Sequence, residues 1–447
     1  MASLLRPPGP PDRNLIGNMP MLQEDPLSIF ARWAREYGDI FHYRVLHRHI
    51  YFINHPDLIK QVLILNAANF VKGDAVRTNR RIFGQGLVSN EGASWSQQRR
   101  LIQPAFHRSR IESYAQTMVA YAERTLDSWH DGQSLDIHQE MMRLALEIVA
   151  QALFSVEIAS GDGERVSRAL NQIMTVSIGP RLLLPRFLHR FPIPTNRKYN
   201  QAVDELDEVV FRMIGERQSD TLAPQDDLLA TLLEARYEDG GAMSTQQLRD
   251  EVLTLLLAGH ETTAVSLTWT WVLLSQHPEV ERKLWAELVG VLNGRSPTVQ
   301  DLPKLPYTDA IIKESMRLYP PVWAITRTAI DKSEIGGYRV PTGTTIVMSQ
   351  WVMHRDPRFY EDPETFLPER WFDARLRTAS RFTYFPFGGG PRVCIGSSFA
   401  SVEAALLLAT IAQKFQVRVT SPASIEPKLS ITLRPNRDVP ATLVKRR

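Results

Sequence analysis

The chain has 447 residues, of which 43% are hydrophobic and 23% are charged, and its formal net charge is +3. This composition is that of an ordinary globular protein. The small net charge and the lack of interleaved basic and aromatic residues argue against a nucleic-acid-binding protein. No repeat, low-complexity tract or Gly/Ser linker divides the sequence, so we expect one large domain over residues 1–447.

Residues 1–20 form a proline-rich arm that contains the run PPGPP from Pro7 to Pro11. No apolar stretch in this arm approaches the length of a signal-peptide core or a membrane anchor. We therefore expect an arm without a membrane anchor, and a cytoplasmic protein.

Helical patterns dominate the rest of the chain, and strand patterns are few and short. We expect helices at residues 57–65, 112–129, 137–153, 198–217 and 278–291. We expect strands at residues 40–45, 50–53, 338–340, 344–348 and 415–419. The sequence therefore predicts a mainly α fold with a small β region.

Trp95 and Arg99 stand four residues apart, at positions that share one face of a predicted helix. An indole N–H and a guanidinium are both hydrogen-bond donors suited to a carboxylate. A plain surface position explains the isolated pair equally well, so the pair gains weight only from the motifs that follow.

The longest predicted helix begins at Ser244, which has the capping-box spacing with Gln247, and extends to about Ser275. It is apolar on nearly all sides, while His260 and Glu261 make a membrane span implausible. This pattern predicts a helix that crosses the interior of a large domain. We expect His260 to pack or to face outward rather than to bind a metal.

The middle of this helix reads AGHETT over residues 258–263. The Thr262 hydroxyl can bond the Ala258 carbonyl and bend the helix, and Gly259 leaves room beside it. The segment predicts a small polar notch in an apolar wall. On these residues alone, a self-satisfied Thr262 with Glu261 facing solvent is the better interpretation.

Glu314 and Arg317 lie three residues apart on another predicted helix and can pair on one face. The same spacing recurs at Glu279 and Arg282, where we expect a solvated surface pair. Only Glu314 and Arg317 precede a double-proline break, and Arg370 follows downstream in the run PERW. Alone, the pair is weak evidence for a site.

Cys394 is the one cysteine of the chain and stands in the run FGGGPRVCIG. It can form no intrachain disulfide, and an inert buried thiol needs no glycine-rich turn, which lets the backbone approach something flat or bulky. The segment from Ser397 to Ile411 is a predicted helix, whose N-terminal amides lower the pKa of a nearby thiol. The resulting thiolate suits iron.

The run fits the pattern F-x-x-G-x-R-x-C-x-G at Phe387, Gly390, Arg392, Cys394 and Gly396, and it resembles the haem-binding loop of the cytochromes P-450. The W-x-x-x-R, acid–threonine and E-x-x-R pairs resemble landmarks of the same family in the same order. The resemblance covers nearly the full chain and favours the soluble prokaryotic type. It implies a single haem domain, with the haem between the long distal helix and the proximal cysteine loop.

By this resemblance, Cys394 is the proximal ligand of the iron of haem b, and its thiolate favours O–O bond cleavage. Thr262 and Glu261 help to deliver protons during oxygen activation. Glu314, Arg317 and Arg370 form a structural ion cluster. The residues expected to bind the cofactor are Trp95, Arg99, Arg327, Phe387, Arg392, Cys394 and Gly396.

The resemblance also implies a monooxygenase that inserts one oxygen atom of O₂ into a hydrophobic substrate, by hydroxylation or epoxidation. A chain of this length leaves no room for a fused reductase, so electrons come from a ferredoxin or flavodoxin with an NAD(P)H-dependent reductase. Arg375, Arg377 and Arg381, opposed locally only by Asp373, are candidates for docking that partner; a solvated basic segment explains them equally well. We expect a monomer.

The substrate stays open, because a fatty acid, a terpenoid or a polyketide would each suit an apolar pocket. A haem-thiolate sensor or carrier, a haem-thiolate isomerase that does not use O₂, and a haem-free protein with a structural cysteine are the alternatives. The acid–threonine pair argues against the first two. Core packing explains many pocket candidates equally well; these are Val88, Leu255, Ala258, Gly259, Val322, Trp323, Ala324, Ile325 and Thr432.

Overall fold

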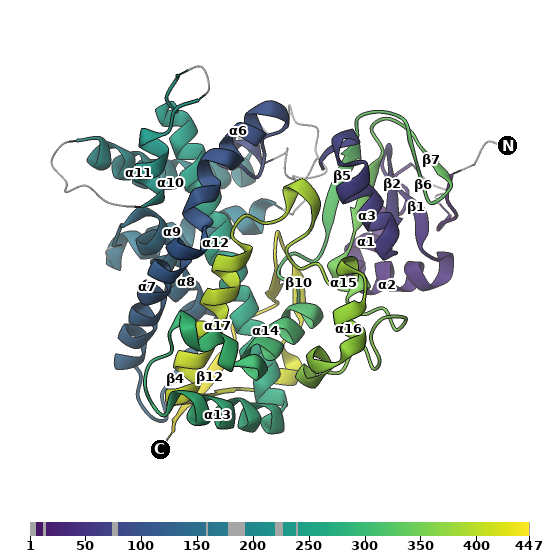
Figure 1. The fold of residues 1–447 in the computed structure, drawn as a ribbon. Coiled ribbons are helices and arrows are strands. Elements are labelled where there is room, and N and C mark those ends of the chain that lie inside the picture. Colours follow the sequence, from purple (N-terminus) through teal and green to yellow (C-terminus); the bar gives the residue numbers. More distant parts are fainter. Residues whose placement is uncertain are drawn as a thin grey trace. The chain divides into compact units, whose positions relative to one another are not determined.

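The computed structural model describes residues 6–11, 15–73, 79–157, 160–177, 193–219, 227–237 and 240–446. The fold is mainly helical with small sheets, which confirms the predicted fold class (Figure 1). The chain divides into two compact units, one of residues 1–77 with 316–394 and one of residues 78–315 with 395–447. The single domain expected over residues 1–447 stays a prediction.

The first unit holds seven of the described strands, and these are β1 (Ile40–Val45), β2 (Arg48–Ile53), β3 (Phe70–Lys72), β5 (Ile325–Ala329), β6 (Ser333–Ile335), β7 (Tyr338–Val340) and β8 (Thr345–Met348). Five of them form one sheet in the order β1-β2-β8-β5-β3, in which β2 and β8 run parallel and the other neighbours antiparallel. Strands β6 and β7 form a separate antiparallel pair.

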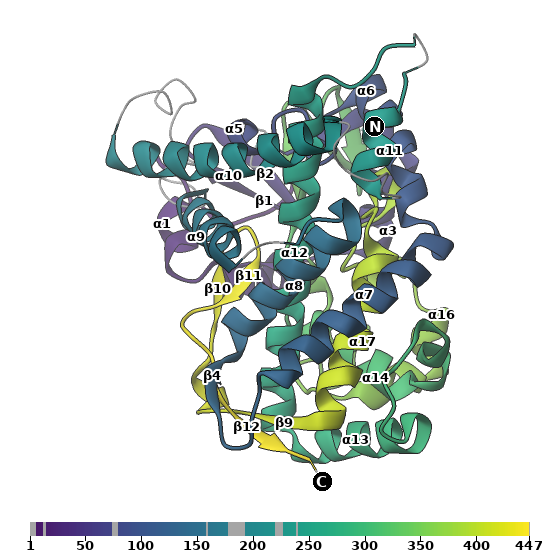
Figure 2. The ribbon, with the colours of Figure 1, turned by 90° about the vertical axis from the view of Figure 1, so that its left-hand side faces the viewer.

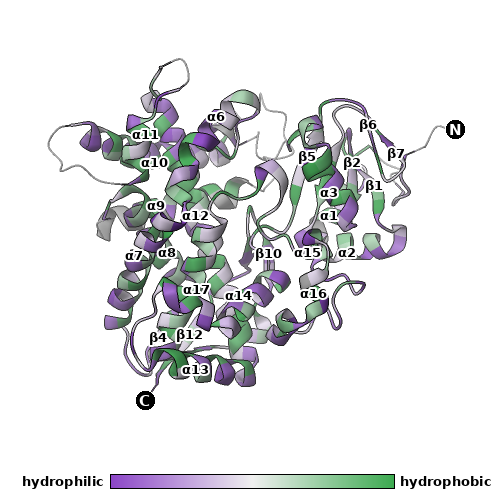
Figure 3. Cartoon of the chain, viewed as in Figure 1, coloured by the Kyte–Doolittle hydropathy of each residue, from purple (hydrophilic) through white to green (hydrophobic). Residues whose placement is uncertain are grey.

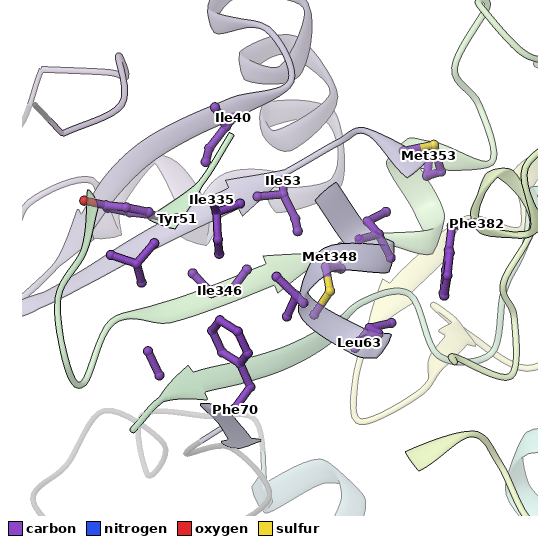
Figure 4. Close-up of a cluster of buried hydrophobic side chains, with 14 of the residues drawn as sticks. Ile40, Tyr51, Ile53, Leu63, Phe70, Ile335, Ile346, Met348, Met353 and Phe382 are labelled. Carbon is purple, nitrogen blue, oxygen red and sulfur yellow. The ribbon is translucent and has the colours of Figure 1, made fainter. Parts of the chain in front are cut away.

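Both faces of the larger sheet are buried, since alternate residues of a strand point to opposite faces. Tyr51 and Ile53 belong to a cluster that also contains Phe382 and Phe385 (Figure 4). Phe52, which lies between them in the strand, belongs to a second, largely aromatic cluster. The segment that leads to the cysteine is therefore packed into the same core as the sheet.

Short helices and single turns complete the first unit, and these are α1 (Met19–Glu24), α2 (Pro26–Tyr37), α3 (Pro56–Lys60), the π-helix η1 (Gln61–Leu65), η2 (Ala67–Asn69), α15 (Gln350–Met353), η7 (Pro368–Phe372), α16 (Ala374–Thr378), η8 (Arg381–Thr383) and η9 (Gly390–Arg392). The stretch between α15 and Cys394 lies wholly within the described residues and contains only short helical turns and no strand. It therefore has little regular backbone pairing of its own.

Long helices make up most of the second unit, and its helical elements are α5 (Arg80–Phe83), α6 (Gly92–Ile102), η3 (Gln103–Phe106), α7 (Arg108–Asp127), α8 (Ile137–Phe154), α9 (Ser160–Ser177), α10 (Pro194–Gln218), α11 (Leu228–Glu234), α12 (Thr245–Gln276), α13 (Pro278–Leu292), η6 (Val299–Lys304), α14 (Pro306–Leu318), α17 (Ser397–Lys414) and η10 (Pro422–Ser424). The last three residues of α14 fall in the first unit. Two small sheets contain β4 (Ser134–Asp136), β9 (Phe415–Val419), β10 (Pro427–Leu429), β11 (Leu433–Pro435) and β12 (Pro440–Lys445).

Helix α12 packs against α8, α10 and α17 within its unit (Figure 2). It begins as predicted, because the Ser244 hydroxyl accepts the Gln247 N–H at 3.1 Å. The Gln247 side chain does not return this bond as a capping box would, and instead donates to the Gln85 carbonyl and to the Glu251 carboxylate. The start of the helix is thus tied to a preceding loop.

Helices on the outside of the unit carry separate polar and apolar faces, as the alternating colours along α7 and α13 show in Figure 3. In α13 the buried residues Val280, Leu284, Leu288 and Leu292 recur every four positions. Each helix and strand expected from the sequence is present, with ends shifted by a few residues. Among the described helices, none is long and apolar enough to cross a bilayer.

Candidate functional site

The cysteine loop is held by short-range backbone hydrogen bonds. The Phe385 carbonyl accepts from the Gly388 N–H at 2.9 Å, and the Phe387 carbonyl accepts from the Cys394 N–H at 3.0 Å. The Cys394 side chain is exposed, and α17 begins three residues later at Ser397. The loop therefore presents a thiol just before the N-terminus of an 18-residue helix, as the sequence predicted.

The glycines of this loop allow close approach to protein rather than only to a ligand. A Cβ on Gly390, at φ +68°, would lie 1.8 Å from the Leu63 carbonyl oxygen of η1. A Cβ on Gly389 would lie 2.5 Å from the ring of Phe382. No side chain fits at either position, so these glycines seat the loop against its own unit.

Two buried arginines bind the segment that precedes the loop. Arg317 donates to the carbonyls of His354 at 2.8 Å and Thr365 at 3.1 Å, and Arg370 donates to the same Thr365 carbonyl at 3.2 Å. Glu314, one turn before Arg317 in α14, is fully buried. The structure thus brings Arg317 and Arg370 together at one main-chain oxygen.

Helix α12 has one uncovered patch. Every residue from Leu248 to Leu274 is buried except Ala258, Gly259 and Thr262, which we call the α12 patch. The Thr262 hydroxyl donates to the Ala258 carbonyl at 2.8 Å, as predicted. Ala258 and Thr262 are one turn apart and share a face. Three small residues in the middle of an otherwise buried helix therefore keep part of their surface uncovered.

Gly259 lies at the edge of this patch and serves the packing of two helices. A Cβ at this position would lie 2.7 Å from Cγ2 of Val149 on α8. The glycine therefore lets α8 and α12 approach closely, whereas the sequence suggested that it opens room beside the threonine.

Glu261 is buried and ion-paired, not solvent-facing. One of its oxygens, Oε1, accepts from the Thr432 hydroxyl and from Nε of Arg434 at 2.6 Å. Arg434 also donates to the Asn171 side chain at 3.0 Å. The ion pair offsets the burial of the charge, and it anchors the acid of the acid–threonine pair to β11, while Thr432 binds it from the turn before that strand.

His260 is buried and packs, which agrees with one of the two positions expected for it. Its Nδ1 lies 3.2 Å from the Leu256 carbonyl, and burial lowers the pKa of the ring. A neutral imidazole can donate to its own helix through Nδ1, while the buried Nε2 has no hydrogen-bond partner among the described residues. His260 is therefore a packing residue of α12.

Comparison with known proteins decides the family. The family model for Cytochrome P450 matches residues 7–439. The chain belongs to the cytochrome P450 family. It is 38% identical to cyclooctat-9-en-7-ol 5-monooxygenase of Streptomyces melanosporofaciens, with 90% of this chain and 88% of the relative covered. It is 37% identical to pentalenene oxygenase of Streptomyces avermitilis, with 92% and 91% covered.

A solved structure agrees with these relatives. The cytochrome P450DA haem domain superposes with a TM-score of 0.89 at 28% identity, covering 100% of this chain and 99% of that chain. This P450 is thus a haem b oxidoreductase of the monooxygenase type. Its cysteine loop fits that cofactor, because an exposed thiol just before a helix is a soft ligand of the kind that haem iron takes.

The predicted propionate ligands occupy partly or fully buried positions in this P450. Arg99 lies over the ring of Trp95, with its Cζ 5.9 Å from the ring centroid, and both are half-buried on α6. Arg327 is buried on β5 and donates to the Thr326 carbonyl at 2.9 Å, and Arg392 is half-buried in η9. Trp95 with Arg99 lies in one unit and Arg327 with Arg392 in the other.

The predicted pocket residues separate into three groups. Trp323 stacks on Phe30, with centroids 6.2 Å apart, Ala324 packs on the same aromatic cluster, and Ile325 packs on the other core cluster of the first unit. Leu255 is buried in α12, and Thr432 is buried against Glu261. The remaining members, Val88, Ala258, Gly259 and Val322, keep part of their surface uncovered.

A buried carboxyl that the motifs did not single out lies in the second unit. Glu403 on α17 is 1% exposed, and burial raises its pKa to about 8, against the opposing effect of the Thr263 hydroxyl on α12. Its only sequence signal is an acid inside the apolar run SSFASVEAALLLATI. Burial in this P450 therefore favours the protonated, neutral form of the Glu403 carboxyl.

Replacing Glu403 tests this protonation state through stability. The folded state holds the proton up to about pH 8, whereas an unfolded carboxyl loses it near its ordinary value of 4.5. The free energy of unfolding of the natural protein should therefore fall as pH rises between these values. Glu403→Gln should remove this decline and be about 1–3 kcal/mol more stable than the natural protein at the upper end.

Thermal unfolding midpoints measured across this pH range check the expectation. The exposed Glu279 offers the matched control, because Glu279→Gln removes a carboxyl from α13 without touching the core. If the pH profiles of Glu403→Gln and the natural protein run parallel, the buried carboxyl is not protonated in the folded state.

Proposed function

We propose that Cys394 is the axial thiolate of haem b and that Trp95, Arg99, Arg327 and Arg392 bind its propionates. The observation that carries the proposal is the lone exposed thiol at the end of a loop whose backbone is fixed on its own unit. A helix N-terminus next to the thiol stabilises its anion, the thiolate. The four donors are of the kind that carboxylates prefer.

Bound haem supplies the redox chemistry with O₂, and the protein supplies protons and orientation. Thr262 is proposed to hold a proton donor at the α12 patch. Since its hydroxyl hydrogen is used in the bond to Ala258, its oxygen presents lone pairs to the uncovered side and can hold a water there. Glu261 is proposed to connect that water, through its ion pair with Arg434, to the Asn171 side chain that Arg434 also binds.

The substrate is proposed to be a terpenoid. Two relatives carry names of terpenoid oxygenases, and both are covered over about nine-tenths of their length. The partly uncovered candidates Val88, Ala258, Val322 and Ile325 are apolar or small, as a hydrocarbon skeleton requires. Oxygen insertion into such a skeleton, by hydroxylation or epoxidation, is the reaction that these features support best.

Electrons are proposed to come from a ferredoxin or flavodoxin with its NAD(P)H-dependent reductase. Arg375 and Arg381 are exposed, as docking of an acidic partner needs, while the side chain of Arg377 lies outside the described residues. Arg375 pairs with Asp373 at 2.7 Å and lies 3.7 Å from Glu361, so two acids oppose it where the sequence suggested one. Of the two arginines whose side chains the structure describes here, Arg375 is the one that these acids offset.

A reduced carbon monoxide difference spectrum tests the central assignment. The purified protein should contain haem b and give the Soret band typical of thiolate ligation. Cys394→Ser should retain less haem and lose that band, because a hydroxyl is a harder ligand than a thiol and loses its proton far less readily. A colourless protein, or a natural protein whose spectrum lacks thiolate ligation, contradicts the proposal.

The substrate class can be tested by titrating the oxidised protein with cyclic terpenes and terpene alcohols. Binding should shift the Soret band as the ligand displaces water at the haem, with little response to fatty acids or macrolides of similar size. The matched comparison is between a terpene and a linear hydrocarbon acid of equal carbon number. An equal or stronger response to the fatty acid removes the terpenoid assignment.

Thr262→Ala should uncouple electron consumption from product formation, by roughly tenfold or more, since proton delivery by a placed group commonly contributes at least that much. Turnover would be measured with a surrogate ferredoxin and its reductase, as product and hydrogen peroxide formed per NAD(P)H consumed. Thr270→Ala is the control, because Thr270 makes the same type of bond to Ser266 in a buried part of α12. Fully coupled turnover in Thr262→Ala contradicts the role.

A further inference from the structure

His354 is a fully buried histidine that the motifs did not single out. It is the C-cap residue of α15 and stands in the irregular stretch between that helix and the cysteine loop. A buried imidazole needs hydrogen-bond partners. The partners of His354 come from two places with different roles in the first unit.

The main chain of His354 binds Arg317, and its side chain binds the segment that leads to the cysteine loop. Its carbonyl accepts from Nη1 of Arg317 at 2.8 Å. Its ring nitrogen Nε2 accepts from the backbone N–H of Phe385 at 3.0 Å. One residue thus joins the arginine of the E-x-x-R motif to the beginning of the segment that ends at Cys394.

The hydrogen bond from Phe385 selects one tautomer of the ring. Because a backbone amide can only donate, Nε2 must carry the lone pair and Nδ1 the hydrogen. Burial, reinforced by the guanidinium groups of Arg317 and Arg355, lowers the pKa of the ring well below its usual value. The ring also contacts those of Tyr384 and Phe385, with centroids 5.1 and 5.4 Å away.

Two backbone hydrogen bonds in succession link Phe385 to the cysteine. Its carbonyl accepts from Gly388, and the next bond in the series runs from the Cys394 N–H to the Phe387 carbonyl. Without an acceptor on His354, the buried Phe385 N–H would lose its partner, and the first of these turns would lose its anchor. The thiol would then sit on a looser loop.

We propose that His354 is a positioning residue for the cysteine ligand, acting through the main chain of Phe385 rather than by contact with the haem. The proposal rests on the assignment of Cys394 as the axial thiolate. The competing explanation is that His354 only ends α15 and fills the core. The two explanations predict different effects of a variant that keeps an aromatic ring but lacks the acceptor nitrogen. Only the positioning role predicts that such a variant weakens thiolate ligation.

The experiment uses the holoenzyme and two variants. His354→Phe keeps an aromatic ring and removes the acceptor, whereas His354→Gln places an amide oxygen the same number of bonds from the backbone as Nε2. The measurement is the rate at which the reduced, CO-bound protein loses thiolate ligation in dilute urea, followed by its Soret band. We expect roughly tenfold faster loss in His354→Phe and a rate within about twofold of the natural protein in His354→Gln.

His138 supplies the matched control for general destabilisation. It is a buried histidine of the second unit, 3.1 Å from the Thr268 hydroxyl, and His138→Phe removes that bond without touching the cysteine loop. This variant should lower the unfolding midpoint and leave the rate of ligation loss near that of the natural protein. Equal acceleration in His138→Phe and His354→Phe overturns the proposal, because it shows a global effect.

Further outcomes separate the proposal from the assignment on which it rests. If the natural protein shows no thiolate ligation, the proposed function fails. If it does and His354→Phe loses ligation no faster, the positioning role alone fails. Should His354→Phe not fold, His354→Asn replaces it, since its oxygen lies at the δ position. Faster loss in His354→Asn than in His354→Gln supports the role, and equal rates overturn it.

Discussion

The backbone around the cysteine has to be held without a helix or a sheet ladder, and the first unit is organised around this constraint. Between Phe385 and Cys394 the structure has one 3-10 turn, η9, so buried amides and carbonyls need individual partners. Arg317 and Arg370 satisfy carbonyls upstream, because a guanidinium offers five donors in a fixed plane. The glycines let the loop rest on η1 and η8, where any side chain would collide.

In the second unit the groups that need hydrogen-bond partners are side chains, because α12 carries polar residues within an apolar helix. Thr268 and Thr270 donate to carbonyls of the preceding turn and so bury their hydroxyls at little cost. Glu261 cannot do this and is paired with Arg434 of β11. Thr262 makes the same type of bond, but it shares with Ala258 a face of the helix that is partly uncovered.

Local sequence patterns predicted the helices and strands, but they could not predict contacts between residues that are far apart in the sequence. Period and capping residues identified α12 and its start at Ser244, since both depend on neighbours in the sequence. The partner of Glu261 lies 173 residues away in a strand with no motif, so the motif that assigned this acid a role in proton delivery could not identify its ion pair. Gly259 was interpreted as a gap, but the direction of its missing Cβ, toward Val149, depends on how α8 packs.

Apolar composition could not separate pocket from core for a physical reason: both are built from the same side chains. Trp323 and Val322 are adjacent and equally suited to line a cavity, yet Trp323 stacks on an aromatic cluster. Incomplete burial of a small residue inside an enclosed element is the better signal, and Ala258 has it. The terpenoid assignment therefore draws its weight from the names of the relatives, because one fold can hold pockets for many substrates.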